Sequence, residues 1–250
     1  MSEIHISNLS KSYGKHNEIQ VVKNISLTLN KGTVFGFIGP NGAGKTSTIK
    51  MLVGLSKPTS GSITIAGETP YDIEVKKHIG FMPESPTFYQ YLTGKEFLEF
   101  IATLFNIHNK DKRIKDVLME VNLLHAQNKK IRTYSKGMSQ RLGLAQAIIN
   151  DPSILFLDEP LDGLDPLGRA EVKKIILNLK EQGKTVFLNT HILGDVAEIC
   201  DLVGVIDNGS LIALDNPKTM ASGFHDLEDA FVTMIKNNRE ENSKLIQTVN

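Results

Sequence analysis

Two short segments of the chain contain residue types that could bind a polyphosphate and cleave a phosphoanhydride bond. The first, Gly39–Thr46, reads Gly-x-x-x-x-Gly-Lys-Thr. Glycines there let backbone N–H groups turn toward phosphate oxygens, and the helix that follows adds partial positive charge at its N-terminus. Lys45 supplies a mobile cation for the terminal phosphates, and Thr46 supplies a hydroxyl ligand for Mg²⁺. The segment therefore predicts a site for a nucleoside triphosphate.

The sequence on either side of this segment has the pattern that a phosphate-binding loop requires. The apolar run Val34–Ile38 predicts a strand before it, and Ile49, Leu52 and Val53 indicate a helix after it. The residues expected to contact the nucleotide from this loop are Gly39, Pro40, Asn41, Gly42, Ala43, Gly44, Lys45, Thr46 and Ser47.

The second segment, residues 134–160, contains a polar turn, a helix and an acidic strand in one run. Four apolar residues, Ile154–Leu157, are bounded by a turn with proline and predict a strand buried on both faces. Asp158 and Glu159 follow at its carboxyl end, where α/β sheets bind ligands. Asp158 is placed to hold Mg²⁺ together with Thr46, and Glu159 could polarise the attacking water.

Composition excludes several other classes of protein. The chain has 250 residues, 40% of them hydrophobic, which is enough for a globular core. Lys+Arg and Asp+Glu are equal at 28 each, so no basic field favours nucleic acid as a partner. The one cysteine, Cys200, excludes an intrachain disulfide, and we expect it to be a packed core residue. No apolar run approaches the ~18 residues of a membrane span and the N-terminus lacks signal-peptide features, so we expect a soluble, cytosolic chain.

The order of the elements predicts an α/β fold with helices inserted between its two halves. The first third is rich in predicted strands, namely Ile4–Leu9, Val21–Leu29, Val34–Ile38 and Ser62–Ile65. A capping box at Thr93-Gly94-Lys95-Glu96 precedes an amphipathic helix whose apolar positions are Phe97, Phe100, Ile101, Leu104 and Phe105. Ile114, Val117, Leu118 and Val121 repeat the pattern, and a third helix is expected from about Gly137 to Ile149.

Strands and helices alternate after Asp158. Asp165-Pro166 predicts the start of a helix that Gly183 ends, and a strand follows over Thr185–Asn189. Asn208-Gly209 predicts a two-residue hairpin.

Six motifs make the chain resemble an ABC-transporter ATP-binding subunit over essentially its whole length. Tyr134–Arg141 is similar to the family's signature, and Ile154–Asp158 to its Walker B strand, with Glu159 as the catalytic glutamate. Leu161–Asp165 resembles the D-loop and His191 the switch histidine. The loop Gly39–Thr46 and Tyr13, in a Ser-Tyr-Gly context, complete the set.

The resemblance implies a P-loop NTPase fold of the ABC ATPase type. It has a mixed or parallel core sheet, an N-terminal antiparallel β subdomain and an inserted helical subdomain. Residues 1–250 would form one such domain. Within it, about 1–85 and 151–235 would be the catalytic core, about 86–150 the helical subdomain, and 236–250 a polar tail expected to fray.

The resemblance also implies a role for each matched residue. Glu159, His191 and Lys45 would be catalytic. Ser135, Gly137 and Asp165 would contact nucleotide, the first two on a neighbouring subunit. Tyr13 would stack on adenine; the alternative is an ordinary tyrosine of an edge strand. Thr46, Glu84 and Asp158 would be the metal ligands.

Three positions depart from the family's usual motifs. Glu84 stands where the Q-loop glutamine is usual, which keeps an acceptor near Mg²⁺, removes an amide donor and adds negative charge. The signature carries Lys136 and Met138 for the usual glycine and glutamine. Lys136 either contributes a cation near the γ-phosphate or points to solvent, and solvent is favoured. With these departures the chain resembles the ABC-2 type export group.

The implied cofactors are ATP and Mg²⁺, and the implied partners are membrane permease subunits and a second ATPase subunit. That second subunit would be another copy of the chain or a close relative, with the pair acting at the cytoplasmic face of the membrane. The permease would contact four side chains, Phe88, Tyr89, Tyr91 and Leu92. The alternative is that these side chains only fill the core of the helical subdomain (about residues 86–150), the helical block. A soluble ABC ATPase acting on ribosomes or DNA is disfavoured because one cassette and no heptad run are present. A GTPase or kinase is disfavoured because no Asn-Lys-x-Asp element occurs.

Overall fold

Nine strands form two separate sheets in the computed structural model, which describes the backbone of residues 2–249. The smaller sheet is antiparallel, in the order β2-β1-β4, and consists of β1 (Ser2–Tyr13), β2 (Ile19–Asn30) and β4 (Ser60–Ile65). The larger sheet has six strands in the order β5-β6-β7-β3-β8-β9. Its members are β3 (Val34–Ile38), β5 (Ile79–Met82), β6 (Ile154–Asp158), β7 (Thr185–Thr190), β8 (Leu202–Asp207) and β9 (Ser210–Asp215).

The larger sheet is mixed. Strands β5, β6, β7, β3 and β8 are parallel neighbours, whereas β9 pairs antiparallel to β8 at the edge. The hairpin between β8 and β9 turns at Asn208 and Gly209, whose φ angles of 47° and 86° are those of a type I′ turn. An α/β fold with an antiparallel β subdomain and a mixed sheet is therefore confirmed.

The three central strands β3, β6 and β7 are buried along their whole length, as the apolar run Ile154–Leu157 predicted for β6. Side chains alternate between the two faces of the sheet. One face carries a cluster of phenylalanine rings, in which Phe187 lies 4.9 Å from Phe35 and 5.8 Å from Phe156, centroid to centroid. The antiparallel sheet covers this face, since Ile4, Ile6 and its other apolar residues pack in the same cluster.

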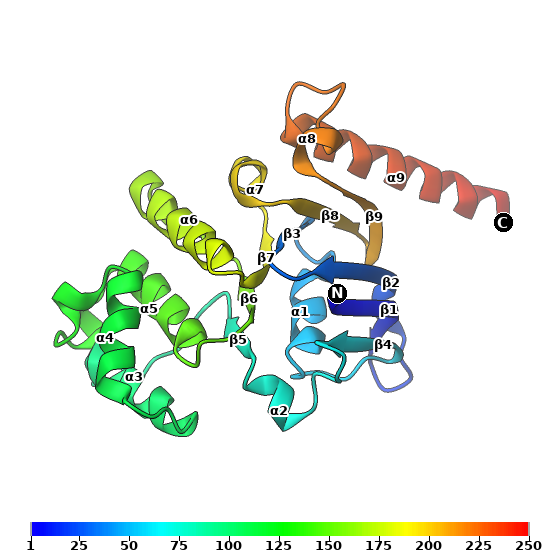
Figure 1. Cartoon of the computed structure of the whole chain (residues 1–250). Helices are drawn as coiled ribbons and strands as arrows, with labels where there is room; N and C mark the ends of the chain where they lie inside the picture. The colour runs from blue at the N-terminus through cyan, green and yellow to red at the C-terminus, as the bar shows by residue number, and fades with distance from the viewer. Residues whose placement is uncertain (1, 250) are drawn as a thin grey trace.

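Helices α1 and α2 pack on the same face as the antiparallel sheet, whereas the other helices pack in the cluster on the opposite face and extend to one end of the molecule, where α3, α4 and α5 group together (Figure 1). Their bounds are α1 (Lys45–Leu52), α2 (Ile73–Lys76), α3 (Gly94–Leu104), α4 (Lys110–Glu120), α5 (Lys136–Ile148), α6 (Pro166–Glu181), α7 (Leu193–Ile199), α8 (Pro217–Met220) and α9 (Leu227–Val249). None of these described helices has the length and apolarity needed to cross a bilayer.

The predicted helix starts are confirmed in atomic detail. The Thr93 hydroxyl accepts a hydrogen bond from the Glu96 N–H, and the Glu96 carboxylate accepts one from the Thr93 N–H, which is the capping box at α3. Asp165 caps α6 by accepting from the Gly168 N–H, with Pro166 at the first helical position. Gly183, at φ 81°, follows the end of α6.

Helix α3 differs from the expected amphipathic helix in one respect. Phe97 and Ile101 are buried, but Phe100, Leu104 and Phe105 are exposed by 43%, 64% and 41%. The 3.6-residue period was right, yet the apolar stripe is wider than the surface that the rest of the chain covers. The helical block therefore presents apolar side chains on its outside.

The C-terminal segment is helical over its described part. The backbone of α9 continues through residue 236 to Val249, and the fraying expected of residues 236–250 stays a prediction. A buried carboxylate stabilises the first half of this helix. Asp207 accepts hydrogen bonds from Arg239 and Asn238 on α9, which fixes the helix against β8.

The glycine Gly80 sets how closely α5 approaches the sheet. A Cβ at Gly80 on β5 would lie 2.0 Å from the Ala147 carbonyl oxygen of α5, so only glycine fits there. Similarly, Gly36 faces the Sγ of Cys200, which is buried as expected; burial also raises the pKa of that thiol.

Candidate functional site

The loop between β3 and α1 is held tightly by the strands on either side of it. A Cβ at Gly39 would lie 2.3 Å from the Ile206 carbonyl oxygen, and one at Gly44 would lie 2.4 Å from that of Val21. Gly44 also has φ 108°, a conformation that L side chains rarely adopt. These two glycines let the loop lie flat against β8 and β2, so that its N–H groups and the N-terminus of α1 face outward.

Lys45, the first residue of α1, turns back over the loop. Its ammonium donates to the carbonyl oxygens of Gly39 at 2.7 Å and Pro40 at 3.3 Å, and the residue is only 8% exposed. Burial lowers the pKa of Lys45, against the opposing effect of Glu159, Asp158 and Glu84, whose charges raise it. A buried cation with neutral acceptors as its hydrogen-bond partners is a strong attractor for an anion.

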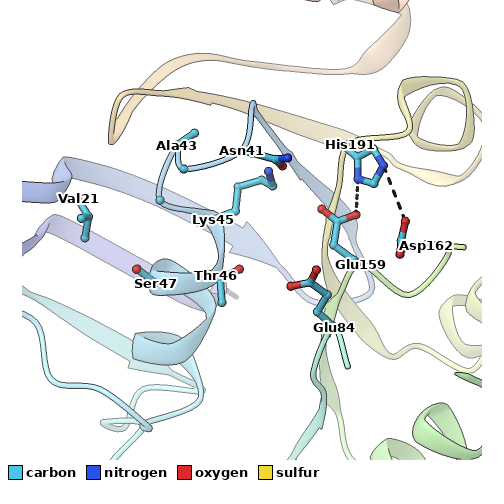
Figure 2. Close-up of a pocket in the computed structure, with 12 residues that line it drawn as sticks. Val21, Asn41, Ala43, Lys45, Thr46, Ser47, Glu84, Glu159, Asp162 and His191 are labelled. Atoms are coloured by element: carbon cyan, nitrogen blue, oxygen red, sulfur yellow. Dashed lines mark hydrogen bonds and ion pairs between the residues drawn. The ribbon is translucent and has the colours of Figure 1, made fainter. Parts of the chain in front are cut away.

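This lysine lies in a cavity of about 610 Å³ that has two chemically different walls (Figure 2). One wall is the loop and the start of α1. The other carries acidic groups and a histidine. The lining residues are Val21, Asn41, Gly42, Ala43, Gly44, Lys45, Thr46, Ser47, Glu84, Glu159, Asp162 and His191. The fold therefore brings the two sequence segments to one cavity, with N–H groups and a cation facing carboxylates.

Glu159 has an unusual backbone conformation at the mouth of β6. Its φ is 51°, in the left-handed region, which costs a residue with a Cβ about 1–2 kcal/mol. Its N–H donates to the Asn189 carbonyl oxygen at 3.1 Å, and its carbonyl oxygen accepts from the side chain of Gln140 at 3.2 Å. The turn directs the Glu159 carboxylate into the cavity, where Figure 2 shows it beside Glu84.

His191 faces Glu159 across a short hydrogen bond. Its Nδ1 lies 2.9 Å from Glu159 Oε2, and its Nε2 lies 4.0 Å from Asp162 Oδ1. Both interactions are drawn in Figure 2. The histidine ring thus bridges two carboxylates and is half exposed toward the cavity.

Asp158 is buried just beneath the cavity at the end of β6. Its Oδ1 accepts a hydrogen bond of 2.9 Å from Asn189 Nδ2, and the other atom of that amide, Asn189 Oδ1, has no hydrogen-bond partner among the described residues. Sequence reasoning missed Asn189, although a polar residue closing the apolar run of β7 was the available signal. An unpartnered buried acceptor beside a carboxylate indicates space for a further polar ligand.

The oxygen-only donors near this point suit Mg²⁺. Thr46, Glu84 and Asp158 offer a hydroxyl and two carboxylates, which are hard ligands, and Mg²⁺ typically takes one or two carboxylates and keeps several waters. Within the part of the chain that the structure describes, no group of three or more His, Cys, Asp or Glu side chains gathers as a complete metal site. The donor set therefore fits a metal that arrives with other ligands, as Mg²⁺ does with phosphates.

A second concavity, of about 450 Å³, lies at the N-terminus of α5. Its lining includes Ser135, Lys136, Gly137, Gly163 and Asp165. Ser135 caps α5 by accepting from the Met138 N–H at 3.2 Å. Sequence reasoning placed Ser135 and Gly137 away from the residues around Lys45, and the two sets do line different cavities.

Lys136 does not simply point to solvent, as the favoured interpretation had it. Its Nζ lies 3.4 Å from Asp162 Oδ2, although the side chain stays 60% exposed. The lysine stem passes over Gly163, where a Cβ would lie 1.6 Å from the ammonium nitrogen. The cation at the start of α5 thus has an acidic partner that offsets its unfavourable position at the positive end of the helix.

Tyr13 lies at the end of β1 and is 41% exposed. The Lys11 ammonium sits over its ring, 4.9 Å from the centroid. The described residues that line the first cavity include Val21 but not Tyr13. Adenine stacking by Tyr13 therefore stays a prediction.

The sequence is similar to a known protein family and to several of its members. The family model described as "ABC transporter" matches residues 22–162. An uncharacterized ABC transporter ATP-binding protein of Synechocystis is 46% identical over 200 residues, which are 78% of this chain and 56% of the relative. The bacitracin transport ATP-binding protein of Bacillus licheniformis is 42% identical over 84% of this chain and 68% of its own length. The fluoroquinolones export ATP-binding protein of Mycobacterium tuberculosis is 39% identical over 86% and 71%.

Solved structures agree with these relatives. A structure titled as the ATP binding subunit of an ABC transporter has a TM-score of 0.82 at 28% identity, covering 92% of this chain and 98% of that chain. The cbiO1 subunit from Clostridium perfringens, described as part of the complex cbiONQ, has a TM-score of 0.80 at 25% identity, covering 89% and 91%. The match spans little more than half the length of the Synechocystis relative.

The pairing of Asn189 with Asp158 makes a pH-dependent prediction. In Asn189→Asp, two carboxylates would lie at hydrogen-bond distance, which raises the pKa of one of them in the folded state only. Stability is then lost as the pH rises from the unfolded pKa near 4 to the raised folded pKa, by about 1.4 kcal/mol per pH unit. We expect the Tm deficit relative to the wild type to grow between pH 5 and pH 8, measured by thermal unfolding. Asn189→Ser, which adds no charge and keeps a neutral hydrogen-bond donor beside Asp158, is the control and should show a deficit that changes less with pH.

Proposed function

Since the chain belongs to the ABC transporter family of ATP-binding proteins, we propose that it is the Mg²⁺-dependent ATPase subunit of an export transporter, working as a head-to-tail pair. The observation that carries the proposal is the separation of the two cavities. The one around Lys45 holds a phosphate loop, a candidate base and a histidine, whereas Ser135 and Gly137 line another. Each chain would supply half of two composite sites.

Within its own half, each residue would act through a contact that its position allows. The loop N–H groups and the Lys45 ammonium would bind the phosphates, with the ammonium leaving the Gly39 carbonyl that now accepts it. Glu159 would accept the proton of the attacking water. His191, which is hydrogen bonded to Glu159, would orient the Glu159 carboxylate and donate a hydrogen bond to the γ-phosphate. Mg²⁺, held by Thr46 and Asp158 with Glu84 nearby, would neutralise charge on the phosphates when bound.

Export is supported by two kinds of evidence. Two relatives that share about four tenths of their residues with this chain are described as acting in bacitracin transport and in fluoroquinolone export. The chain also has Glu84 and Lys136 where the wider family usually has glutamine and glycine. Both features fit the ABC-2 type export group.

The helical block offers a surface for the membrane partner. Tyr89 and Tyr91 are 62% and 80% exposed, and Tyr89 packs edge-to-face against Phe100, with centroids 5.9 Å apart. Phe88, in contrast, is buried against Phe97, so only part of the predicted set is free to dock. We define the apolar patch as Tyr89, Tyr91, Phe100, Leu104 and Phe105. Exposed aromatic side chains, two of them packed on each other, are typical of a protein–protein interface.

The partner that contacts this patch would be an integral membrane permease, with the ATPase bound to it at the cytoplasmic face of the membrane. Glu84 lines the nucleotide cavity and Tyr89 lies five residues later, so one loop joins the site to the apolar patch. A change at the phosphates would therefore reach the permease through a short, continuous segment.

Glu159→Gln tests the ATPase and the pairing together. The amide keeps the hydrogen bond to His191 but cannot take a proton, so we expect kcat to fall by about 10²–10⁴-fold while ATP binding persists. ATP should then convert the variant to a stable dimer in size-exclusion chromatography with light scattering. Normal hydrolysis by this variant would exclude Glu159 as the base, and a variant that stays monomeric with ATP would exclude the head-to-tail pair.

Glu84→Gln tests the metal side of the cavity. An amide is a weaker Mg²⁺ ligand than a carboxylate, and its neutral charge no longer repels the γ-phosphate. We expect the Mg²⁺ concentration for half-maximal ATPase activity to rise several-fold, with hydrolysis retained at saturating Mg²⁺. Glu68→Gln, an exposed glutamate on the β subdomain, is the control. An unchanged Mg²⁺ response of Glu84→Gln would remove Glu84 from the metal site.

If the apolar patch binds the permease, substitutions in it should abolish permease binding and leave ATP hydrolysis intact. The double variant Tyr89→Ser, Tyr91→Ser should keep its ATPase activity in solution but no longer copurify with a membrane protein from detergent-solubilised membranes of the cells that make it. Leu55→Ser, which replaces a similarly exposed apolar residue outside the helical block, should copurify normally. Copurification of the double variant at wild-type yield would move the permease contact elsewhere.

A further inference from the structure

Gln140 is a buried polar residue that does not line the nucleotide cavity. It lies on the second turn of α5 and is 5% exposed. Its Nε2 donates to the backbone carbonyl oxygen of Glu159 at 3.2 Å. Without Gln140, this buried carbonyl oxygen would lose the hydrogen bond that the side chain donates to it. Such a loss is costly for a buried acceptor, so Gln140 stabilises the backbone of Glu159.

The carbonyl that Gln140 binds belongs to a residue whose backbone is left-handed. Glu159 has φ 51°, so the direction of its side chain depends on a conformation that a residue with a Cβ seldom adopts. Two hydrogen bonds hold it from opposite sides, one from its own N–H to Asn189 and one from Gln140 to its carbonyl. Asn189 belongs to the sheet, whereas Gln140 belongs to a helix of the inserted block.

Helix α5 therefore connects two places of interest. Its N-terminus, capped by Ser135, lines the second cavity, and one turn later Gln140 holds Glu159 of the first. The helix is packed closely on the sheet, since Gly80 admits the Ala147 carbonyl at a distance that no side chain would allow. A small shift at the N-terminus of α5 is thus carried to Gln140 by a rigid element, not by a flexible loop.

We propose that Gln140 is a positioning residue that fixes the Glu159 carboxylate for catalysis and couples it to the nucleotide bound at the N-terminus of the same α5. The inference rests on the proposed function, since it needs a neighbour's nucleotide at Ser135. Binding there would seat α5 and, through Gln140, hold the left-handed turn that aims Glu159 at its own nucleotide. One chain would then hydrolyse ATP only when the other half of its surface is also occupied.

The test uses two substitutions of Gln140 in the full chain. Gln140→Met keeps the length and removes the donor, and Gln140→Asn keeps the amide but is one methylene too short to reach the carbonyl. Each should lower kcat by about 10- to 100-fold, the cost of a base misplaced by about 1 Å. KM for ATP should stay within about two-fold, because Gln140 touches no nucleotide. Gln146→Leu, at the other glutamine of α5, is the matched control and should leave kcat unchanged.

A second readout separates positioning from a general weakening of α5. Introduced into Glu159→Gln, Gln140→Met should leave the ATP-dependent dimer intact, because the closed pair needs α5 but not the aim of the carboxylate. Unchanged kcat in both Gln140 variants overturns the inference, as does a loss of kcat that is accompanied by loss of the ATP-dependent dimer. The proposed function itself would be overturned if the wild-type chain did not hydrolyse ATP and its Glu159→Gln variant did not dimerise with ATP. If the wild-type chain is active and the Gln140 variants are unaffected, only this inference is overturned.

Discussion

Strands β3, β6 and β7 are buried on both faces, so a charged side chain cannot be placed within them at low cost. A charge in the middle of such a strand would lose its hydration without gaining a partner. Polar groups therefore gather where these strands end, with Asp158 at the end of β6, Asn189 near the end of β7 and the loop before Lys45 after β3. Because the strands are parallel, those ends lie at one edge of the sheet, and the cavity forms there.

The same burial leaves each of these groups short of one interaction. The Lys45 ammonium binds carbonyl oxygens, and burial lowers its pKa. Asp158 accepts from one amide, and the oxygen of that amide has no partner among the described residues. A polyphosphate with its hydrated cation would supply an anion to the first and donors to the others. These groups would be satisfied together by a ligand that combines both charges, which supports the proposed Mg·ATP more strongly than the loop motif alone.

How far the sequence predicts this molecule depends on the range of the interaction. Capping at Thr93 and the loop before Lys45 depend on neighbours within a few residues, so their patterns were sufficient. Gln140 and Asn189 become important only through partners 19 and 31 residues away. The neighbouring sequence gives no sign of the role of Gln140, and for Asn189 it gives only a polar residue at the end of an apolar run. Periodicity likewise found the apolar positions of α3 but could not tell which would be covered by this chain and which by another, since both kinds obey the same spacing.

The positions of α5 and the loop after β5 explain why the inserted helices can be more than a packing unit. Both begin or end at a cavity, Glu84 at the first and Ser135 at the second, and both run into the helical block. The block also carries the apolar patch around Tyr91. A movement of the block as one body would therefore change the aim of Glu159 through Gln140, the acidic wall through Glu84 and the outer surface at the same time. Coupling of this kind needs no long chain of contacts, because each of the three sites is attached directly to the same rigid group of helices.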